Sequence, residues 1–501
     1  MSEYFSLIMQ STNNSVGATQ TWNGAFSNDS SGEDLTNLFY SSCRGIDRSR
    51  FEELLNASWI ASPLYTLKCI AYIRDIRGGK GERQLGRWAL EWLSSKSPSD
   101  LERNIKSYVD QYGRWDDLLS LVTLNKDLVC STFKAQLVAD LESLGGNKSI
   151  SLCAKWVPSE GKSVDKKTHI FKHIAAAMEI SNSDLRHQLT SLRKKIDLVE
   201  SHLCDMTLEQ VNYSHVPSKC MHIHSKPKNA FIRRDEARFN EYKQALVKGE
   251  AKINASTLFP HEIVNSTYNS QDDAIIDAQW HCMIEKLSAE EKHHLSKTMA
   301  VVDVSGSMMN GTSSARPIDV AIAIGLLVSE MNPNSALKNK ILTFSSNPRF
   351  HSVTGTTLRA RCQSINHSDW AMSTDFIKAF RLILDTAKQH KLTQENLPDT
   401  LIVISDMQFN SGTNENEYLS NYEILYKEYE QAGYKVPKLV FWNVNGSTKD
   451  YPVVAGNTNT ALVSGFSIDI LKDVLAGEDV TPLKTAIRTL SKERYASIVR
   501  A

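Results

Sequence analysis

The segment 299–307 constrains the fold of this 501-residue chain most strongly, because an uninterrupted apolar run ends there in a polar loop. Residues 299–302, Met-Ala-Val-Val, are apolar throughout, which is typical of a strand buried on both faces of a parallel sheet. The run ends in Asp303, Ser305 and Ser307, one carboxylate and two hydroxyls on a tight loop. In open α/β sheets ligands bind at the carboxyl ends of strands, and hard oxygen donors suit Mg²⁺, Mn²⁺ or Ca²⁺. The segment therefore indicates a buried strand that ends in either a cation site or an ordinary Asx/Ser turn.

Strand-like and helix-like patterns alternate from this segment to about residue 475. Apolar runs typical of strands lie at 340–344, 349–353, 400–405, 438–443 and 461–464, and helical patterns lie at 319–331, 374–387, 421–432 and 468–475. Such alternation predicts right-handed crossovers and a mostly parallel sheet covered by helices on both faces. The run at 349–353 follows its predecessor so closely that we expect it to pair back on 340–344. The fold class predicted for this part is a doubly wound α/β domain.

Two further polar positions follow other elements of the predicted sheet. The strand 400–405 is followed by Asp406, again a carboxylate at the carboxyl end of a strand. The helix predicted from 374 opens with Thr374, whose hydroxyl could cap the helix or turn toward a cation. Loops that follow different strands can converge on one edge of an α/β sheet. The sequence therefore predicts one cation site built from Asp303, Ser305, Ser307, Thr374 and Asp406.

The first half of the chain has a different pattern, in which apolar residues recur at three- and four-residue spacing. The clearest helical segments are 34–40, 48–59, 62–76, 82–93, 101–108, 115–122 and 128–144. Short connections between successive amphipathic helices predict an all-α, helical-repeat-like (HEAT-like) domain. Residues 1–35 are rich in Ser, Asn, Thr and Gly, which predicts a flexible arm that Trp22 and Phe26 could tie down. The predicted domains are the arm 1–35, the helical domain 36–295, the α/β domain 296–485 and a C-terminal helical tail 486–501.

Length and composition restrict the class of protein. A chain of 501 residues exceeds the ~250–300 residues at which a single core usually divides, so more than one domain is expected. The formal net charge is zero, so no global field favours nucleic acid or an anionic membrane. No apolar run is long enough to predict a membrane span, and the first ten residues do not resemble a signal peptide. The eight cysteines include no C-x-x-C pair, which predicts reduced thiols and a cytoplasmic location.

The segment 74–83, Arg-Asp-Ile-Arg-Gly-Gly-Lys-Gly-Glu-Arg, combines glycines with cations in a way that suggests a phosphate loop. It follows a predicted helix and lacks the spacing and the Ser or Thr of the Walker pattern, so a nucleotide site is disfavoured. We expect a glycine-rich turn between two helices, with cations that are solvated or paired with Asp75 and Glu82. The alternative is contact with the phosphates of RNA. That contact would use Arg77, Lys80 and Arg83.

The segment 213–252 is also basic, with nine Lys and Arg against four Asp and Glu. Four aromatic residues interleave with these charges: Tyr213, Phe231, Phe239 and Tyr242. Basic and aromatic residues together could follow a nucleic-acid backbone and stack bases. The cations that would do so are Lys226, Lys228, Arg233 and Arg234. We favour the interpretation that the aromatics face the core below an exposed amphipathic helix. Cys220, His222 and His224 alternate here, but no second ligand pair follows, so zinc is disfavoured.

Two other segments stand out by composition. In 112–119, Tyr-Gly-Arg-Trp-Asp-Asp-Leu-Leu, Gly113 suits the end of a helix, and Trp115 and the leucines suit the core. Residues 154–159, Ala-Lys-Trp-Val-Pro-Ser, predict an extended loop, because proline favours that conformation in the residue before it. We assign a ligand to neither segment.

The predicted cation site resembles the metal-ion-dependent adhesion site of von Willebrand factor A domains, in the order and spacing of its residues and in the α/β pattern of 296–485. The resemblance implies that Mg²⁺ binds the hydroxyls of Ser305, Ser307 and Thr374 directly. It implies that Asp303 and Asp406 act directly or through water, and that a partner's carboxylate completes the coordination. The loop before Thr374 lacks the glycines common in that family. Thr356 or Thr357 is therefore an alternative ligand.

A wider resemblance covers nearly the whole chain. It rests on the segment 74–83, Lys155-Trp156-Val157-Pro158-Ser159, Val216-Pro217-Ser218, Ser405-Asp406-Met407 and Phe441-Trp442-Asn443. These motifs resemble domain-of-unknown-function family 2828, found in plants, fungi and large DNA viruses. The layout is similar to the Ro/TROVE ribonucleoproteins, in which a ring of helical repeats binds RNA and an A-type domain closes the ring. A viral source would place the protein in the host cytoplasm or the virion.

Three functions follow from these patterns. The first is a non-enzymatic, Mg²⁺-dependent binding or scaffold protein that captures an acidic side chain of a protein partner, as a monomer without membrane contact. The second is an RNA-binding ribonucleoprotein scaffold that binds a small structured RNA. The third, a metal-dependent hydrolase, is disfavoured because no His/Glu motif accompanies the Asp303 loop. We therefore expect no enzymatic activity.

Overall fold

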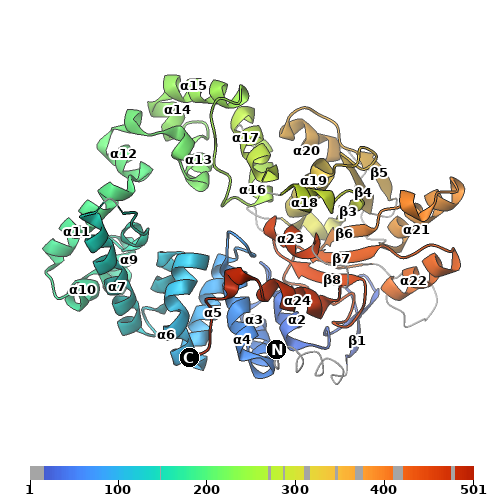
Figure 1. Ribbon diagram of the computed structural model, residues 1–501, viewed down its shortest axis with the longest axis horizontal. Helices are drawn as coiled ribbons and strands as arrows, with labels where there is room; N and C mark the ends of the chain where they lie inside the picture. Colours follow the sequence, from blue (N-terminus) through green and yellow to red (C-terminus); the bar gives the residue numbers. More distant parts are fainter. Residues whose placement is uncertain are drawn as a thin grey trace.

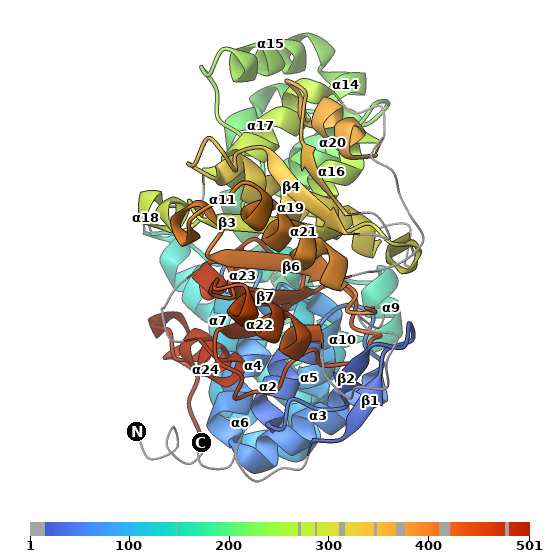
Figure 2. The ribbon, with the colours of Figure 1, turned by 90° about the vertical axis from the view of Figure 1, so that its right-hand side faces the viewer.

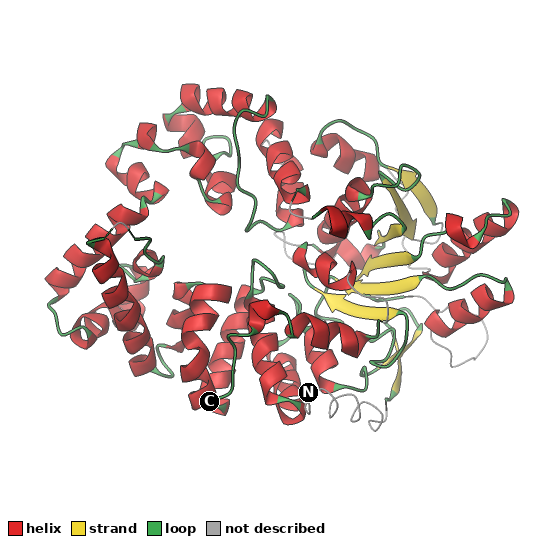
Figure 3. Ribbon diagram, viewed as in Figure 1, coloured by secondary structure: helices red, strands yellow, loops and turns green. Residues whose placement is uncertain are grey.

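The computed structural model describes residues 16–146, 148–268, 272–285, 288–309, 316–344, 348–366, 376–409, 421–475 and 480–501. Within these ranges a helical part is followed by an α/β part, as predicted (Figure 1). Figure 3 shows that the main sheet lies in the second part, at one end of a largely helical molecule. In the described ranges, no helix combines the length and the apolar character needed to cross a membrane.

The helical part runs from α2 to α18. Its elements are α2 (Asp34–Ser41), α3 (Arg48–Ala61), α4 (Pro63–Arg74), α5 (Arg83–Lys96), α6 (Pro98–Ser107), η1 (Tyr108–Tyr112), η2 (Trp115–Leu121), α7 (Lys126–Leu144), α8 (Cys153–Trp156), α9 (Ser163–Thr168), α10 (Ile170–Ala177), α11 (Asn182–Ile196), α12 (Val199–Asp205), η3 (Leu208–Gln210), η4 (Tyr213–His215), α13 (Ser218–His224), α14 (Ala230–Arg234), α15 (Glu236–Val247), α16 (Pro260–Thr267), α17 (Asp273–Ile284) and α18 (Ala289–His293). Side-chain caps fix several starts: the Asp47 carboxylate, for example, accepts the N–H of Ser49 at 2.8 Å where α3 begins. Each helix predicted before residue 144 has a counterpart, although the one at 115–122 is a 3₁₀ helix.

The α/β part contains a six-stranded sheet in the order β5-β4-β3-β6-β7-β8. Its elements are β3 (Thr298–Asp303), η5 (Gly306–Met309), α19 (Pro317–Met331), β4 (Lys340–Phe344), β5 (Arg349–Ser352), α20 (Leu358–Asn366), α21 (Phe376–Gln389), η6 (Gln394–Asn396), β6 (Thr400–Ser405), α22 (Asn421–Gln431), β7 (Lys438–Asn443), β8 (Thr460–Ser464), α23 (Asp469–Leu475), α24 (Pro482–Leu490) and η7 (Glu493–Tyr495). All neighbouring strands are parallel except β4 and β5, which form the predicted hairpin. β3 pairs with β6 up to Val302 and Ile404, so the carboxyl ends of these two strands meet at one edge.

Helices cover both faces of this sheet, which confirms the doubly wound fold. Val302 and Ile404 belong to the core shared with α19, α23 and α24, whereas Val301 and Val403 belong to the core under α21 and α22. Figure 2 shows α21 and α22 in front of the sheet, with α19 and α23 behind it. The face with α19 also meets the helical part, because α2 packs on β8 and α24, and α16 packs on α19. The core on the α19 face therefore extends through both parts.

The helical part forms an arc whose two ends both contact the α/β part, so the molecule is a closed ring (Figure 1). The ends of the arc also approach each other. The guanidinium carbon of Arg44, after α2, lies 5.6 Å from the ring centroid of Phe259, which precedes α16. The same carbon lies 4.6 Å from the ring centroid of Phe466, which follows β8. Arg44 therefore joins the two ends of the arc to the sheet.

The C-terminal residues pack back on the first helices. α24 ends at Leu490 and the turn η7 follows it, so half of the predicted helical tail 486–501 is helical. The Tyr495 hydroxyl donates to the Asp75 carboxylate at 3.2 Å, and Arg494 forms an ion pair with the same carboxylate. The N–H of Val499 donates to Oδ1 of Asn104 at 3.0 Å. These contacts attach the tail to α4 and α6.

The described part of the N-terminal arm is ordered by a two-stranded hairpin, β1 (Ala18–Gln20) and β2 (Phe26–Asn28). The tip of this hairpin lies on the loop after β6. The Thr21 hydroxyl donates to the carbonyl of Phe409 at 2.6 Å, and the backbone N–H of Trp22 donates to Oε1 of Gln408 at 2.7 Å. The Trp22 side chain is 93% exposed, so Trp22 holds the arm through its backbone N–H and not through its ring. The side chain of Phe26 lies outside the described part.

Candidate functional site

The predicted cation site lies where β3 and β6 end side by side. The Ser405 hydroxyl donates to Oδ2 of Asp303 at 2.6 Å, and the backbone N–H of Ser305 donates to Oδ1 at 2.9 Å. The Asp303 carboxylate is completely buried, so its two oxygens meet protein donors rather than bulk water. Adjacent parallel strands thus orient the carboxylate toward the loop that follows β6.

The hydroxyls of the Asp303 loop join the same cluster. Oγ of Ser305 lies 3.1 Å from Oγ of Ser307, and Ser307 also forms a hydrogen bond with the Asp406 carboxylate. Oδ1 of Asp406 accepts the N–H of Gln408 at 3.2 Å. The structure therefore brings together four of the five predicted ligands. Thr374 lies outside the described residues.

The alternative threonines leave the sheet at the opposite edge. β5 runs antiparallel to β4, and the N–H of Val353 donates to the carbonyl of Asn339, just before β4 begins. Thr357 opens α20, where its hydroxyl accepts the N–H of Ala360 at 3.2 Å. Thr356 and Thr357 thus follow the amino-terminal edge of β4, whereas Asp303 lies at a carboxyl edge. The alternative that one of them completes the cation site is wrong.

The electrostatics of the site suit a cation. Burial, together with repulsion from the Asp406 carboxylate, raises the pKa of Asp303 to about 7. Burial also raises the pKa of Asp406. Two buried carboxylates at close range repel each other, and a divalent cation between hard oxygen donors relieves that repulsion. Among the described residues, no three His, Cys, Asp or Glu side chains cluster around a metal position, so hydroxyls and outside ligands would have to complete the coordination.

Lys80, one of the cations expected to contact RNA, is completely buried. Its ammonium group donates to the carbonyls of Phe39 and Ser42 at the end of α2, and to the hydroxyl of Ser464 on β8 at 2.7 Å. A cation is stabilising at the C-terminal end of a helix, where carbonyls lack helical partners. Lys80 is therefore a structural link between α2, the loop after α4 and the sheet. The interpretation of Lys80 as an RNA contact is wrong.

The other charges of the segment 74–83 also find distant partners. Asp75 binds Arg494, and Glu82 accepts a hydrogen bond from Nε of Arg44 at 3.3 Å. Arg83 is half-exposed and forms an ion pair with Asp116 at 2.5 Å, and Arg77 is exposed. Of the two expected alternatives for the cations, solvation holds for Arg77, whereas pairing with Asp75 or Glu82 is wrong, because Arg494 and Arg44 bind those carboxylates.

The aromatics of the segment 213–252 form a small core of their own. The ring centroid of Tyr213 lies 5.0 Å from that of Phe231 and 5.1 Å from that of Phe239, and all three side chains are buried. The favoured interpretation of these aromatics as core residues is confirmed. The cations of the segment lie outside this core: Lys228, Arg233 and Arg234 are exposed, and Lys226 is partly exposed.

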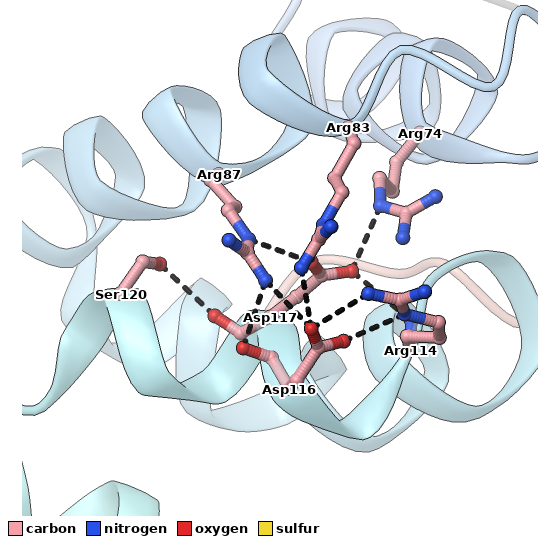
Figure 4. Close-up of polar contacts among 7 residues, drawn as sticks. All are labelled: Arg74, Arg83, Arg87, Arg114, Asp116, Asp117 and Ser120. Atoms are coloured by element: carbon pink, nitrogen blue, oxygen red, sulfur yellow. Dashed lines mark hydrogen bonds and ion pairs between the residues drawn. The ribbon is translucent and has the colours of Figure 1, made fainter. Parts of the chain in front are cut away.

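A cluster of arginines and aspartates joins α4 and α5 to η2 (Figure 4). This Arg–Asp cluster consists of Arg74, Arg83, Arg87, Arg114, Asp116 and Asp117. Oδ2 of Asp117 accepts from Nε of Arg74 at 2.8 Å, and Oδ1 accepts from Nε of Arg87 at 2.8 Å. Sequence reasoning placed 112–119 in the core and missed the cluster. Its one available signal was the helical spacing of Arg83 and Arg87, which puts both on the same face.

The fold defines the class of protein: a helical ring closed by an α/β domain whose sheet carries clustered carboxylates and hydroxyls at one edge. Residues 21–128 and 126–292 match the family model "Domain of unknown function (DUF2828)", and residues 297–497 match "Domain of unknown function (DUF7788)". The chain belongs to the DUF2828 family.

Two similar proteins illustrate its relationships. The chain is 29% identical over 511 residues to the "Uncharacterized protein L728" of Acanthamoeba polyphaga mimivirus, across 94% of this chain and 86% of that protein. Among solved structures, the Deinococcus radiodurans RO (RSR) protein aligns with 88% of this chain and 98% of its own, at 13% identity and a TM-score of 0.43.

Proposed function

We propose that the protein is a non-enzymatic binding or scaffold protein that captures an acidic group of a protein partner through a divalent cation. The observation that carries this proposal is the pair of buried carboxylates, Asp303 and Asp406, at the meeting carboxyl ends of β3 and β6. Ser305 and Ser307 add hydroxyl oxygens beside them. This set of hard donors suits Mg²⁺, with Mn²⁺ or Ca²⁺ as alternatives.

The residues that would hold the cation are Asp303, Asp406, Ser305 and Ser307, with Thr374 as a further proposed ligand. When bound, the cation would offer an open coordination position to a carboxylate from a partner. Hydrogen bonds from the protein fix the orientation of the two carboxylates: the Ser405 hydroxyl donates to Asp303, and the N–H of Gln408 donates to Asp406. Hydrogen bonds of this kind orient ligands and are a normal part of a cation site.

The surroundings of the two carboxylates favour binding over catalysis. In the described part of the chain, their hydrogen-bond partners are the side chains of Ser305, Ser307 and Ser405 and backbone N–H groups. A hydrolytic metal site usually works with a general acid or base within hydrogen-bond reach. None of these partners is such a group, which supports the proposal of a protein without enzymatic activity.

The test is titration of the full chain with Mg²⁺ or Mn²⁺ by isothermal calorimetry. We expect one bound ion for the wild type, and an affinity at least about 10-fold weaker for D303N, because the replacement removes one of two charged ligands. The matched control is D197N, which removes an exposed carboxylate elsewhere on the helical part. Failure of the wild type to bind either ion, or equal binding by D303N, would contradict the proposal.

A second candidate function is an RNA-binding scaffold. It is favoured by the cations that stay accessible, Arg77, Lys228, Arg233 and Arg234. Binding carried by phosphate contacts weakens steeply with salt. For a single strand, the logarithm of the binding constant falls against the logarithm of the salt concentration with a slope of about −0.7 per contact. The test is crosslinking of the full chain to RNA, followed by affinity measurements over a range of salt. Recovery of no RNA would eliminate this candidate and leave the first one intact.

A further inference from the structure

Three segments that are far apart in the sequence meet at the Arg–Asp cluster. Arg83 begins α5, Arg114 precedes η2, and Trp156 ends α8. The Arg114 guanidinium binds Asp116 through two parallel hydrogen bonds of 2.7 Å, and its carbon lies 4.0 Å from the ring centroid of Trp156. The segment 74–83, through Arg83 and Asp116, and the Lys-Trp-Val-Pro-Ser segment at 155–159, through Trp156, thus both reach the Arg–Asp cluster.

The cluster carries an excess of positive charge. Four guanidiniums surround two carboxylates (Figure 4). Neighbouring charges are already balanced, because Lys155 pairs with Glu200 at 3.1 Å and Glu82 pairs with Arg44. Asp110 also lies nearby and accepts a hydrogen bond from the Trp115 indole. With Asp110 included, four arginines still outnumber three carboxylates, so the net charge stays positive.

The positive charge lies on the outside of the cluster. The side chains of Arg83, Arg114 and Arg87 are 49%, 38% and 23% exposed. The two carboxylates lie beneath them, and that of Asp117 is almost completely buried. Burial, together with repulsion from Arg87 and Arg114, lowers the pKa of Arg83. The accessible surface of the cluster is therefore cationic, although both acids are paired.

The accessible guanidiniums retain donors for a ligand. Arg114 engages Asp116 through Nε and Nη2, and Arg83 engages the same carboxylate through Nη2. Each guanidinium has five N–H donors in a planar fork, which suits two-point binding of phosphate oxygens. The stacked pair of Arg114 and Trp156 adds a planar surface of the kind on which unpaired bases stack.

We propose that Arg83, Arg87 and Arg114 form a site for the phosphate groups of a single-stranded nucleic acid, with the Arg114–Trp156 stack beside it for a base. This inference rests on the second candidate function and gives it a location. A nucleic-acid strand is favoured over a phosphorylated peptide because the guanidiniums adjoin an aromatic stack rather than an isolated pocket. The exposed cations Lys228, Arg233 and Arg234 are not required for this site.

The test measures anisotropy of a fluorescein-labelled, unstructured 15-nucleotide RNA with the full chain. R83Q removes a half-exposed cation, and R114K keeps the charge but removes the planar fork and the stacking surface. We expect the affinity to weaken by about 5- to 20-fold in each variant. In R83Q, the slope of log affinity against log salt concentration should become shallower by about 0.7, the value for one phosphate contact to a single strand. R103Q, which removes an exposed arginine of α6, is the matched control and should stay within about twofold of the wild type.

Each outcome decides between the function and the site. Binding by the wild type with unchanged binding by R83Q and R114K would overturn the site and leave the RNA candidate standing. No binding by the wild type would overturn both. A third experiment compares two competitors of equal charge, a phosphorylated peptide and unlabelled RNA. If the peptide displaces the labelled RNA as effectively as unlabelled RNA does, the proposal that this site is specific for nucleic acid is overturned. R114K could unfold at a lower temperature than the wild type. In that case the affinities of R83Q and W156A, measured at a temperature where both variants are folded, decide the result.

Discussion

At the scale of single residues, Lys80 shows that tertiary contacts can give a residue a different role from the one that its sequence motif suggests. A lysine between glycines suggests a phosphate contact, yet this one donates to two carbonyls at the end of α2 and to Ser464. Asp303 shows the opposite case, because its position after an apolar run was enough to place it at the edge of the sheet. A strand end is a local property of the sequence, whereas the partner of a buried cation is not.

Replacing Lys80 with methionine should destabilise the protein by about 1–3 kcal/mol, because the buried carbonyls of Phe39 and Ser42 lose their hydrogen-bond donor. Urea denaturation of K80M against wild type measures this free energy of unfolding. K96M removes an exposed lysine from the end of α5 and should change stability by less than about 0.5 kcal/mol. Equal stability of K80M and K96M would contradict the structural role.

The same residue predicts a pH dependence. Burial lowers the pKa of Lys80 to about 8, below the ordinary value of 10.5. Below pH 8 the group is protonated in both the folded and the unfolded chain, so its contribution to the free energy of unfolding does not change with pH. Between about pH 8 and 10.5 the unfolded chain binds the proton more tightly, and the contribution of Lys80 to stability therefore rises with pH. The urea midpoints of wild type and K80M should lie further apart at pH 9.5 than at pH 7.5, and a constant difference would refute the assignment.

At the scale of elements, the loop between α4 and α5 depends on glycine for close packing rather than for phosphate binding. A Cβ at Gly79 would lie 2.2 Å from the carbonyl oxygen of Tyr72. By contrast, a Cβ at Gly145 would meet nothing within 4 Å, and the backbone there has an ordinary helical φ of −71°. The two glycines therefore differ in what a methyl group would do.

G79A should lower the melting temperature strongly, because the collision with Tyr72 forces the backbone apart and costs about 3 kcal/mol or more. G145A should be neutral or stabilising by up to about 1 kcal/mol, because alanine restricts the unfolded chain without strain. Differential scanning calorimetry of both variants makes the comparison. A melting temperature of G79A equal to that of G145A would show that the loop can open without cost.

The elements that were predicted best are those whose pattern is local. The strands at 340–344, 400–405 and 438–443 have the predicted bounds, because buried apolar runs end where polar loops begin. The Arg–Asp cluster was not predicted, because its ion pairs from α4 and α5 to η2 join residues 29 to 43 positions apart. The doubly wound fold and the proximity of Asp303, Ser305, Ser307 and Asp406 thus followed from the sequence, whereas the contacts between helices did not.

At the scale of the whole molecule, the C-terminal tail fastens the α/β part to the first helices of the ring. Asp75 is completely buried, and Nη2 of Arg494 donates to it at 2.7 Å. The Tyr495 hydroxyl donates to the carbonyl of Gly78 at 3.0 Å. Because the core is continuous through both parts, loosening the tail should affect the whole molecule rather than one domain.

R494M should destabilise the protein by about 2–3 kcal/mol, because the buried carboxylate of Asp75 loses its cation. The cost is below that of a fully buried pair, because solvent partly screens the Arg494 side chain in the wild type. R48Q breaks the surface ion pairs of Arg48 with Glu52 and Glu91 and should cost at most about 1 kcal/mol. Unfolding in guanidinium, followed by tryptophan fluorescence and circular dichroism, should give one transition for wild type and for R494M. Two separated transitions in the wild type would show that the ring does not unfold as a unit.

The packing of α24 on α2 also sets an order of events during synthesis. α2 ends at Ser41 and α24 begins at Pro482, more than 400 residues later. At about 5–20 residues per second, the ribosome needs roughly 20–90 s to deliver the helix that covers α2. Throughout that interval the apolar side chains that α2 shares with β8 and α24 have no native cover. The helical half therefore leaves the ribosome with an unfinished surface, and we expect a nascent chain stalled before residue 482 to bind chaperones that the released protein does not.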